Sequence, residues 1–275
     1  DIDFKCKMDT GSWSYCSSPK TYTGLSRGTY HQFQVKATDS SGNEGDPDSW
    51  IWEILEIYPL IVDVNGNGDY TKIQDAIDNA TVGDTILVWA GTYREKIVVD
   101  KALTLTGNGS ASTKIVGNIS QFENTTRILV YLTSDDIVFQ KINITLESRG
   151  TSSSYFDTLL TIEGDDITLY NNSFYNHNTN GMINVFVEGD HVNVSKNKFY
   201  YSEWGIYTNY ADYGTYSENL FIGCGSWTFA CSTFAILSSS YNIIENNTFY
   251  RSKYGISVHD SSSYNELWFN TLDYS

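Results

Sequence analysis

Hydrophobic and polar residues alternate in short runs along most of the chain, and turn-forming residues separate these runs. Three runs resemble one another: DITLYNNSF at 166–174, HVNVSKNKF at 191–199 and NIIENNTF at 242–249. Alternation with a period of two residues predicts half-buried β-strands. An Asn recurs after the alternating residues, at positions 172, 197, 219, 247 and 270. Intervals of 22 to 28 residues between these Asn residues predict a solenoid in which each repeat is one coil.

The recurring Asn has a structural interpretation. Stacked coils place each Asn above its counterpart in the preceding coil, so that the side-chain amides can hydrogen-bond to one another. A buried amide without a partner costs free energy, and a ladder of Asn residues avoids that cost. We therefore expect the five Asn residues to form a structural ladder rather than a binding site.

One segment departs from the strand pattern and predicts a short amphipathic helix over about 71–81. Four apolar residues recur there at helical spacing: Ile73, Ala76, Ile77 and Ala80. Thr71 and Gln74 have the spacing of a capping box at the start of this helix. A lone amphipathic helix ahead of a β-repeat can cover the exposed edge of the first coil, so we expect it to act as a cap.

The residues around this helix resemble a known family. Residues 61–118 are similar to the N-terminal segment of proteins of the pectin-lyase-like superfamily; their sequence is IVDVNGNGDYTKIQDAIDNATVGDTILVWAGTYREKIVVDKALTLTGNGSASTKIVGN. The shared motifs are G-x-G-x-[YF]-x-x-I-x-x-A-I, GD-x-I-x-V-x-x-G-x-Y-x-E and K-x-L-T-L-x-G. The later repeats resemble NosD or CASH-type repeats. This resemblance implies an all-β fold, a right-handed single-stranded parallel β-helix with an N-terminal capping helix.

Residues 1–58 have a different pattern, with short alternating strands joined by Gly, Ser and Pro turns, which predicts a small β-sandwich. The text CKMDTGSWSYCSSPKTYTGLSRGTYHQFQVKATDSSGNEGDPDSWIWEI resembles bacterial Ig-like or fibronectin-type modules. The match covers the later part of such a module, so its first strands are expected upstream of Asp1. We expect a partial Ig-like β-sandwich at 1–58 and a parallel β-helix, truncated at its C-terminus, at 59–275.

Composition supports the all-β prediction and limits the partners. Aromatic residues make up 15% of the chain, with 21 Tyr against only 3 Pro, a mixture rich in strand formers. The 33 acidic and 17 basic residues give a net charge of −16, which disfavours nucleic acid, anionic membranes and polyanionic substrates. No apolar run has the length of a membrane span, so we expect no membrane insertion of this segment.

Cysteines and glycosylation motifs indicate an extracellular, cell-surface location. The four Cys form two local couples, Cys6 with Cys16 and Cys224 with Cys231, for which we expect two local disulfides in an oxidising compartment. Eight N-x-[ST] sequons fit a glycosylated surface. Because the motif is short, an Asn-rich chain also produces it by chance.

Two acidic patterns are candidate calcium sites. The loop from Asp63 to Gln74 nearly matches an EF-hand loop, but Gln replaces the bidentate Glu and no helix precedes it, which favours an ordinary turn. The second pattern is a column of acids on neighbouring coils: Glu163, Asp165, Glu188 and Asp190. Like charges on coils about 4.8 Å apart repel or share a cation. This column is the better calcium candidate, with solvated turn residues as the alternative, and we expect no other cofactor.

Motifs for catalysis are not found in the sequence. No G-x-S-x-G nucleophile motif occurs, and the QAVA and QDTL strings implied by the resemblance to pectinesterases are missing. Glu203, Asp212 and Glu218 are the acids that one coil offers to a glycosidase, but acids are common on a surface of this charge. We therefore assign no catalytic residue.

Aromatic residues are the other candidate site. Four rings are predicted to contact the sugars of a neutral glycan: Trp204, Trp227, Tyr254 and Trp268. Packing in the narrow interior of the solenoid is the alternative for such rings. The sequence favours a non-enzymatic surface protein, a scaffold or weak carbohydrate-binding β-helix with a polysaccharide or cell-surface glycan as partner. The alternative is a polysaccharide-degrading lyase, glycoside hydrolase or pectinesterase-like enzyme with an unrecognised site.

Overall fold

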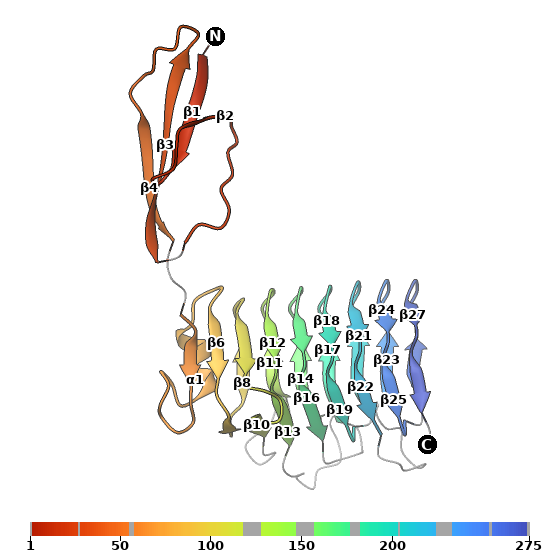
Figure 1. Cartoon of the computed structure of the whole chain (residues 1–275). Coiled ribbons are helices and arrows are strands. Elements are labelled where there is room, and N and C mark those ends of the chain that lie inside the picture. The colour runs from red at the N-terminus through yellow and green to blue at the C-terminus, as the bar shows by residue number, and fades with distance from the viewer. Residues whose placement is uncertain are drawn as a thin grey trace. The chain divides into compact units, whose positions relative to one another are not determined.

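The computed structural model describes residues 2–26, 28–54, 58–117, 128–146, 157–176, 182–202, 204–223, 233–252 and 255–273. The chain divides into two compact units, Asp1–Tyr58 and Pro59–Ser275, and Figure 1 shows the strands of each. In the described part of the chain, no helix has the length and apolar character needed to cross a bilayer.

The first unit is a four-stranded antiparallel sheet with the strand order β2-β1-β3-β4. Its strands are β1 (Ile2–Met8), β2 (Ser14–Cys16), β3 (Thr29–Asp39) and β4 (Asp48–Ile54). A disulfide between Cys6 and Cys16 joins β1 to β2, with the two Cα atoms 5.8 Å apart. The register pairs Met8 with Phe33 and Phe33 with Trp50, so alternation brings apolar side chains to one face of the sheet.

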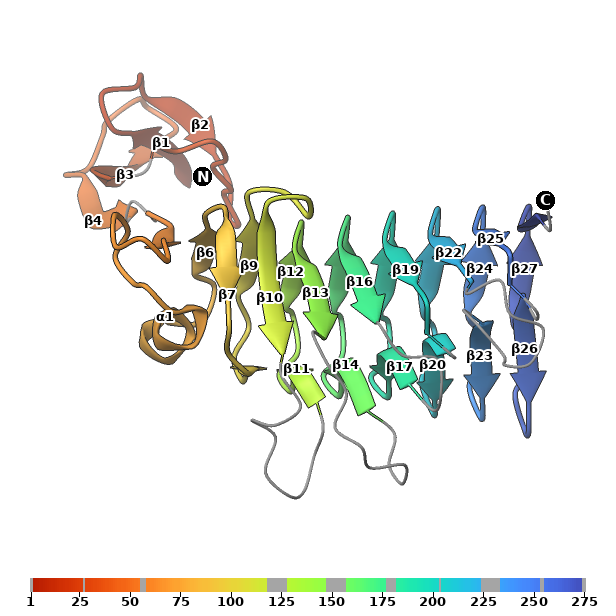
Figure 2. The ribbon, with the colours of Figure 1, turned by 90° about the horizontal axis from the view of Figure 1, so that it is seen from below.

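The second unit is a right-handed parallel β-helix made of three sheets, which confirms the fold predicted from the repeats (Figures 1 and 2). Each full coil contributes one strand to each sheet, and every strand pairs in parallel with its counterparts in the neighbouring coils. Parallel pairing joins segments that are about one repeat apart in the sequence, which explains the recurring pattern of apolar residues.

The bounds of the strands are as follows. The nine-stranded sheet contains β5 (Leu60–Val62), β6 (Thr85–Val88), β9 (Thr104–Gly107), β12 (Val138–Gln140), β15 (Thr168–Tyr170), β18 (Asn193–Ser195), β21 (Thr215–Ser217), β24 (Ile243–Glu245) and β27 (Glu266–Trp268). The eight-stranded sheet contains β7 (Gly91–Tyr93), β10 (Thr113–Gly117), β13 (Asn143–Leu146), β16 (Ser173–Asn176), β19 (Lys198–Tyr200), β22 (Leu220–Ile222), β25 (Thr248–Tyr250) and β28 (Thr271–Asp273). The seven-stranded sheet contains β8 (Ile97–Val99), β11 (Ile128–Leu132), β14 (Asp157–Ile162), β17 (Met182–Val187), β20 (Trp204–Asn209), β23 (Thr233–Leu237) and β26 (Ile256–His259).

Stacked side chains fill the interior of the β-helix. Phe174, Phe199, Phe221 and Phe249 come from four successive strands of the eight-stranded sheet and are almost completely buried. Their ring centroids are 5.1, 4.8 and 4.6 Å apart, with nearly parallel rings. Repetition of Phe at one position of four successive coils therefore produces a continuous aromatic stack.

The predicted Asn ladder is confirmed. The backbone N–H groups of Asn172, Asn197, Asn219 and Asn247 each donate to the Oδ1 atom of the next Asn along the chain, at 2.8 to 3.0 Å. The Nδ2 atom of each of these residues donates to a backbone carbonyl of the preceding coil. Each buried Asn thus bonds to the coil before it and to the coil after it.

The helix α1 (Ile73–Asn79) is shorter than the predicted 71–81, and its start is stabilised differently from the prediction. The capping box is wrong, because the N-cap residue is Lys72 and no side-chain capping bond forms there. Instead, the carboxylate of Glu95 accepts the N–H groups of Ile73 and Gln74 at 2.9 and 3.0 Å. The three apolar residues Ile73, Ala76 and Ile77 are fully buried, and the helix contacts β5, β6 and β8.

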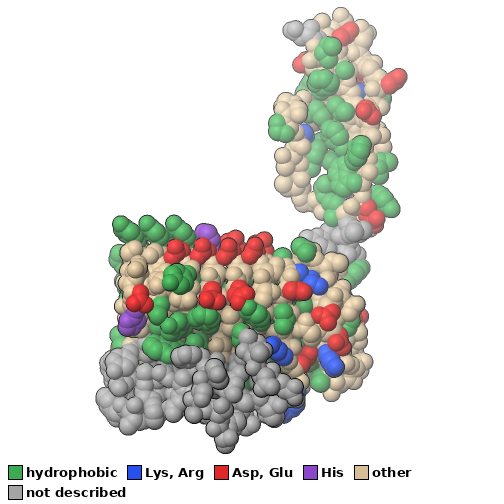
Figure 3. All heavy atoms as spheres, turned by 180° about the vertical axis from the view of Figure 1, so that it is seen from behind, with side chains coloured by type: hydrophobic (Ala, Val, Ile, Leu, Met, Phe, Trp, Pro, Cys, Tyr) green, Lys and Arg blue, Asp and Glu red, His purple; other side chains and the backbone are tan. Residues whose placement is uncertain are grey.

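An aromatic ladder lies on the surface, in the turns between the seven-stranded and nine-stranded sheets. The rings of His191, Tyr213, Tyr241 and Tyr264 stack with centroids 5.3, 5.1 and 5.0 Å apart, and Figure 3 shows hydrophobic side chains and a His in a row at one edge of the β-helix. All four residues have φ between 56° and 59°, a region that bulky side chains rarely adopt. Stacking between the coils offsets this strain.

Replacing Tyr241 with Asn is expected to lower the free energy of unfolding by about 1 kcal/mol, because the ring contacts with Tyr213 and Tyr264 are both lost. Asn tolerates the left-handed backbone, so the substitution isolates the stacking contribution. The matched control is Tyr210→Asn, since Tyr210 has φ 56° and is 72% exposed, without a ring contact among the described residues. Urea denaturation followed by circular dichroism measures both variants. Equal stabilities of the two would contradict a stabilising role for the ladder.

Candidate functional site

The candidate site lies on the outer face of the seven-stranded sheet. Tyr131, Thr161, Phe186 and Tyr207 are register partners on β11, β14, β17 and β20. Their neighbours in each strand are buried in the interior, so these four side chains point outward and form one row across the sheet. We call this set the outer row.

A second row of outward-pointing side chains lies two residues further along the same strands. Ile162 pairs with Val187, and Val187 pairs with Thr208, so the residues that follow them, Glu163, Glu188 and Asn209, are aligned. The hydroxyl of Tyr131 donates to Oε1 of Glu163, and Nδ2 of Asn209 lies 3.5 Å from Oε1 of Glu188. Two exposed carboxylates therefore lie side by side on adjacent coils. We call Glu163 and Glu188 the glutamate pair.

Three aromatic rings pack together on β17 and β20. The ring centroids of Phe186 and Tyr207 are 5.7 Å apart, and the ring of Trp204 meets that of Tyr207 edge-on at 5.6 Å. All three rings are half-buried, so each keeps part of its surface in solvent. We call these three residues the aromatic cluster. Rigid rings with an open side offer apolar contact area at little entropic cost.

The electrostatics of this face are set by its carboxylates. Burial, followed by the hydrogen bond that Tyr131 donates to Glu163 and the charges of Glu163 and Glu188, raises the pKa of Tyr131 to about 12. Burial, and then the charge of Asp260, also raises the pKa of Tyr207. Both phenols therefore stay protonated to a higher pH than an ordinary tyrosine and can act as hydrogen-bond donors. Figure 3 shows acidic side chains beside hydrophobic ones on one face of the β-helix.

The four predicted calcium ligands occupy two different environments. Glu163 and Glu188 form the glutamate pair, whereas Asp165 and Asp190 lie in the adjoining turns. There, Oδ1 of Asp165 accepts the N–H of Asp190 at 2.8 Å, and Oδ1 of Asp190 accepts the N–H of Asp212 at 2.7 Å. Within the described ranges, no group of three or more His, Cys, Asp or Glu is placed to hold a metal ion. Calcium binding by these four acids stays a prediction.

The acid-rich loop near the start of the β-helix forms a turn. The carboxylate of Asp63 accepts hydrogen bonds from the backbone and side-chain nitrogens of Asn65 and Asn67, at 2.8 to 3.3 Å. These bonds lower the pKa of Asp63. The contacts agree with the predicted turn at this segment.

The predicted sugar-binding rings are not gathered in one place. Trp204 belongs to the aromatic cluster, but Trp268 lies in β27 of the nine-stranded sheet and donates from Nε1 to Glu266 at 3.0 Å. Trp227 and Tyr254 lie outside the described residues, as do Glu203 and the couple of Cys224 and Cys231.

Sequence reasoning missed Phe186, Tyr207 and Tyr131 as members of the site. Their signal was available in the alternation of each strand, since each follows a buried apolar residue and precedes another buried residue. Assigning them to one row required the register between strands that are 21 to 30 residues apart in the sequence.

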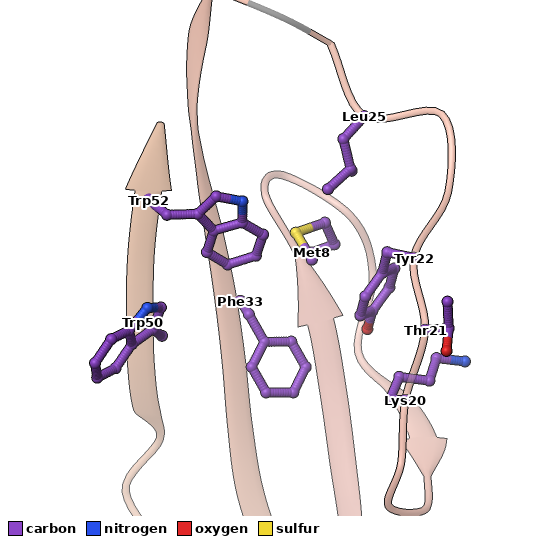
Figure 4. Close-up of a pocket in the computed structure, with 8 residues that line it drawn as sticks. All are labelled: Met8, Lys20, Thr21, Tyr22, Leu25, Phe33, Trp50 and Trp52. Carbon is purple, nitrogen blue, oxygen red and sulfur yellow. The ribbon is translucent and has the colours of Figure 1, made fainter. Parts of the chain in front are cut away.

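The first unit contains a separate pocket of about 460 Å³ on the apolar face of its sheet. Figure 4 shows its lining: Met8, Phe33, Trp50 and Trp52 from the strands, and Lys20, Thr21, Tyr22 and Leu25 from the segment after β2. Trp50 is 71% exposed, and the ring centroids of Tyr22 and Phe33 are 6.0 Å apart. This face is the kind of surface that packs against a second sheet in a β-sandwich.

Comparison with known proteins gives partial matches. The chain is 28% identical over 131 residues to the probable pectinesterase 67 of Arabidopsis thaliana, covering 44% of this chain and 38% of the relative. It is 41% identical over 70 residues to a cell surface glycoprotein of Methanothermus fervidus, covering 25% of this chain and 11% of the relative. The chain thus spans well under half of the length of these curated relatives.

A likeness to solved structures covers more of the chain. The pectin methylesterase of Aspergillus niger aligns with a TM-score of 0.48 and 16% identity, covering 79% of this chain and 86% of that one. The family described as the right handed beta helix region matches residues 103–272, which are 170 of the 275 residues. Because this match includes more than half of the sequence, the chain belongs to the right-handed β-helix family.

Proposed function

We propose that the chain is a non-enzymatic extracellular protein whose β-helix serves as a rigid scaffold and binds a polysaccharide on the outer face of the seven-stranded sheet. The observation that carries this proposal is the aromatic cluster of Phe186, Trp204 and Tyr207. Half-buried rings held by a packed sheet need little ordering on binding, so they suit the flat apolar faces of sugar rings. Trp268 is retained as a separate candidate ring because it is about half exposed.

The partial relatives support a polysaccharide partner and a surface location. One is a probable pectinesterase and another is a cell surface glycoprotein. The disulfide between Cys6 and Cys16 favours an oxidising compartment, which agrees with the same location. From these observations we infer that this chain also lies at the cell surface and binds a carbohydrate.

The glutamate pair is the observation that favours an enzyme as the second candidate. Glycoside hydrolases use two carboxylates that flank the scissile bond. Glu163 and Glu188, however, follow equivalent positions of neighbouring strands, so both lie in one row of one sheet face. A ligand resting on that face meets both carboxylates from the same side, which favours binding over hydrolysis.

We further infer the roles of the parts around the site. The four-stranded sheet, with one apolar face, corresponds to one layer of an Ig-like or fibronectin-type module acting as a spacer. The helix α1 covers the first coil, because it buries Ile73, Ala76 and Ile77 against β5, β6 and β8. The Asn ladder supports repeats of the NosD or CASH type.

Substituting the aromatic cluster tests the proposal. Trp204→Ala and Tyr207→Ala are each expected to weaken polysaccharide binding by about tenfold, because each removes a contact ring. The control is Trp89→Ala, since Trp89 is 37% exposed and lies outside the seven-stranded sheet. Affinity electrophoresis in gels that contain neutral or acidic polysaccharides measures the loss.

An assay of turnover separates the two candidate functions. Purified protein is incubated with the same polysaccharides, and reducing ends, unsaturated products and released methanol are measured. Turnover by the unsubstituted protein that disappears in Glu163→Gln or Glu188→Gln would show that the protein is an enzyme and would contradict the proposed non-enzymatic scaffold. Unchanged binding in both aromatic variants would remove the outer face as the binding site.

A further inference from the structure

We propose that the polysaccharide bound on this face is a polymer of amino sugars, whose ammonium groups bind the glutamate pair while its sugar rings contact the aromatic cluster. This inference rests on the proposed function and names its ligand class.

The glutamate pair lacks a cationic partner among the described residues. Glu163 accepts from the hydroxyl of Tyr131, and Glu188 from the amide of Asn209, and both donors are neutral. Neither glutamate takes part in the ion pairs formed in the described part of the chain. Adjacent coils place the two residues about 4.8 Å apart along the β-helix, a spacing at which like charges repel. A ligand ammonium between the carboxylates relieves this repulsion.

The aromatic cluster lies at a suitable distance from the glutamate pair. Phe186 lies in β17 and precedes Glu188, the first residue after this strand, by two residues, which corresponds to about 7 Å of extended chain. A sugar ring that stacks on Phe186 or Tyr207 can therefore direct an amino substituent toward the carboxylates. Ammonium groups are attracted both by aromatic ring faces and by carboxylates, so the two parts of the face favour the same ligand.

Further carboxylates border this face along the turns. Asp165, Asp190 and Asp212 each use Oδ1 to accept a backbone N–H of the next coil. These bonds hold the three carboxylates in a column beside the glutamate pair. Together with the glutamate pair, these carboxylates give this edge of the face a negative potential. Such a potential attracts a polycation and repels polymers of uronic acids.

A buried hydroxyl in the outer row provides a second, independent indication of a ligand. Thr161 lies between its register partners Tyr131 and Phe186 and points out of the same face. Thr161 is 3% exposed, and its Oγ1 atom has no hydrogen-bond partner among the described residues. A buried hydroxyl without a partner is costly. A ligand hydroxyl or amine that enters this row by displacing the half-buried rings of Tyr131 and Phe186 can supply the missing bond.

The arrangement suits an ammonium group better than calcium. Calcium requires six to eight oxygen ligands around one point. Here Asp165 and Asp190 are engaged in the turns, which leaves the glutamate pair as two ligands on an open face. An ammonium group needs only a few acceptors and one or two nearby rings.

The test compares ligands that differ only in charge. Isothermal titration calorimetry of the full chain uses three tetramers with the same β-1,4 linkage: glucosamine, N-acetylglucosamine and glucose. We expect the glucosamine tetramer to bind about tenfold more tightly than the other two, and this preference to vanish in Glu163→Gln and Glu188→Gln. Glu245→Gln is the matched control, because Glu245 lies in β24 of the nine-stranded sheet. Added salt should weaken the binding of the glucosamine tetramer only.

Each other outcome identifies what has failed. Equal affinities for the three tetramers, all lost in Trp204→Ala, would overturn the amino-sugar inference and leave the proposed function intact. Absence of binding by every tetramer would overturn the amino-sugar inference, whereas the proposed function fails only if the electrophoresis panel also shows no binding. A glucosamine preference that persists in both Glu→Gln variants would place the recognition elsewhere and overturn the inference. Binding of calcium chloride alone that disappears in those variants, together with no glucosamine preference, would replace the inference with a cation site.

Discussion

Replacing Asn219 with Ala is expected to lower the free energy of unfolding of the β-helix by about 4 kcal/mol. The Oδ1 atom of Asn219 accepts the backbone N–H of Asn197 at 2.9 Å, and its Nδ2 atom donates to the carbonyl of Val194 at 2.7 Å and to Oδ1 of Asn247 at 3.0 Å. Asn219 is 1% exposed, so water cannot replace these bonds without opening the coil. The substitution therefore leaves a donor and an acceptor buried without partners.

Urea denaturation followed by circular dichroism measures this loss. The control is Asn193→Ala, since Asn193 is exposed in β18 and its side chain makes no hydrogen bond in the described structure. The control is expected to change stability by less than about 0.5 kcal/mol. If Asn219→Ala lowered the free energy of unfolding no more than the control does, the ladder would be a consequence of the stacked coils and not a source of their stability.

Replacing Gly189 with Ala is expected to destabilise the β-helix by about 3 kcal/mol and to weaken ligand binding as well. A Cβ atom at this position would lie 1.9 Å from the carbonyl oxygen of Gly164, a backbone atom of the neighbouring coil. That oxygen cannot move away alone, because the bond between Asp165 and the N–H of Asp190 ties the two turns together. The coils must separate locally, and Glu188, which directly precedes Gly189, moves with them.

Thermal denaturation and calorimetric titration of the same variant measure both effects. The matched control is Gly117→Ala, where the nearest atoms to a new Cβ are methyl groups of Leu129 and Leu146 at 3.0 to 3.1 Å. Those side chains can adjust, so the control is expected to lose about 1 kcal/mol and to bind normally. A loss in Gly189→Ala no larger than in the control would show that the turns tolerate a wider coil spacing.

The coil architecture was predictable because it depends on residue types repeated at one interval. The sequence pattern alone predicts the ladder, from the repeated Asn172 and Asn197. It also predicts which side chains point into the interior, from the alternation around Leu169 and Val194. The start of α1 was not predictable in this way. Its donors are satisfied by Glu95, which lies 22 residues after Ile73, and a capping rule based on neighbouring residues cannot detect such a partner.

The candidate site was only half predictable for a related reason. The interval of 25 residues correctly aligned Glu163 with Glu188, but it assigned Asp165 and Asp190 to the same column. Gly164 and Gly189, between each Glu and the following Asp, let the backbones of neighbouring coils approach closely, and the Asp carboxylates bond within the turns. The aromatic cluster depends on the register of three strands, which no single repeat reveals.

The Asn ladder also fixes the length of the β-helix as a whole number of equivalent coils. Each Asn bonds to the same atoms of the coil before and the coil after, so the coils are interchangeable with respect to these bonds. Gain or loss of a whole coil preserves every contact of this kind, whereas gain or loss of a few residues interrupts it. Length in such a molecule changes in steps of about 4.8 Å, and distances between groups carried on different coils are set by counting coils.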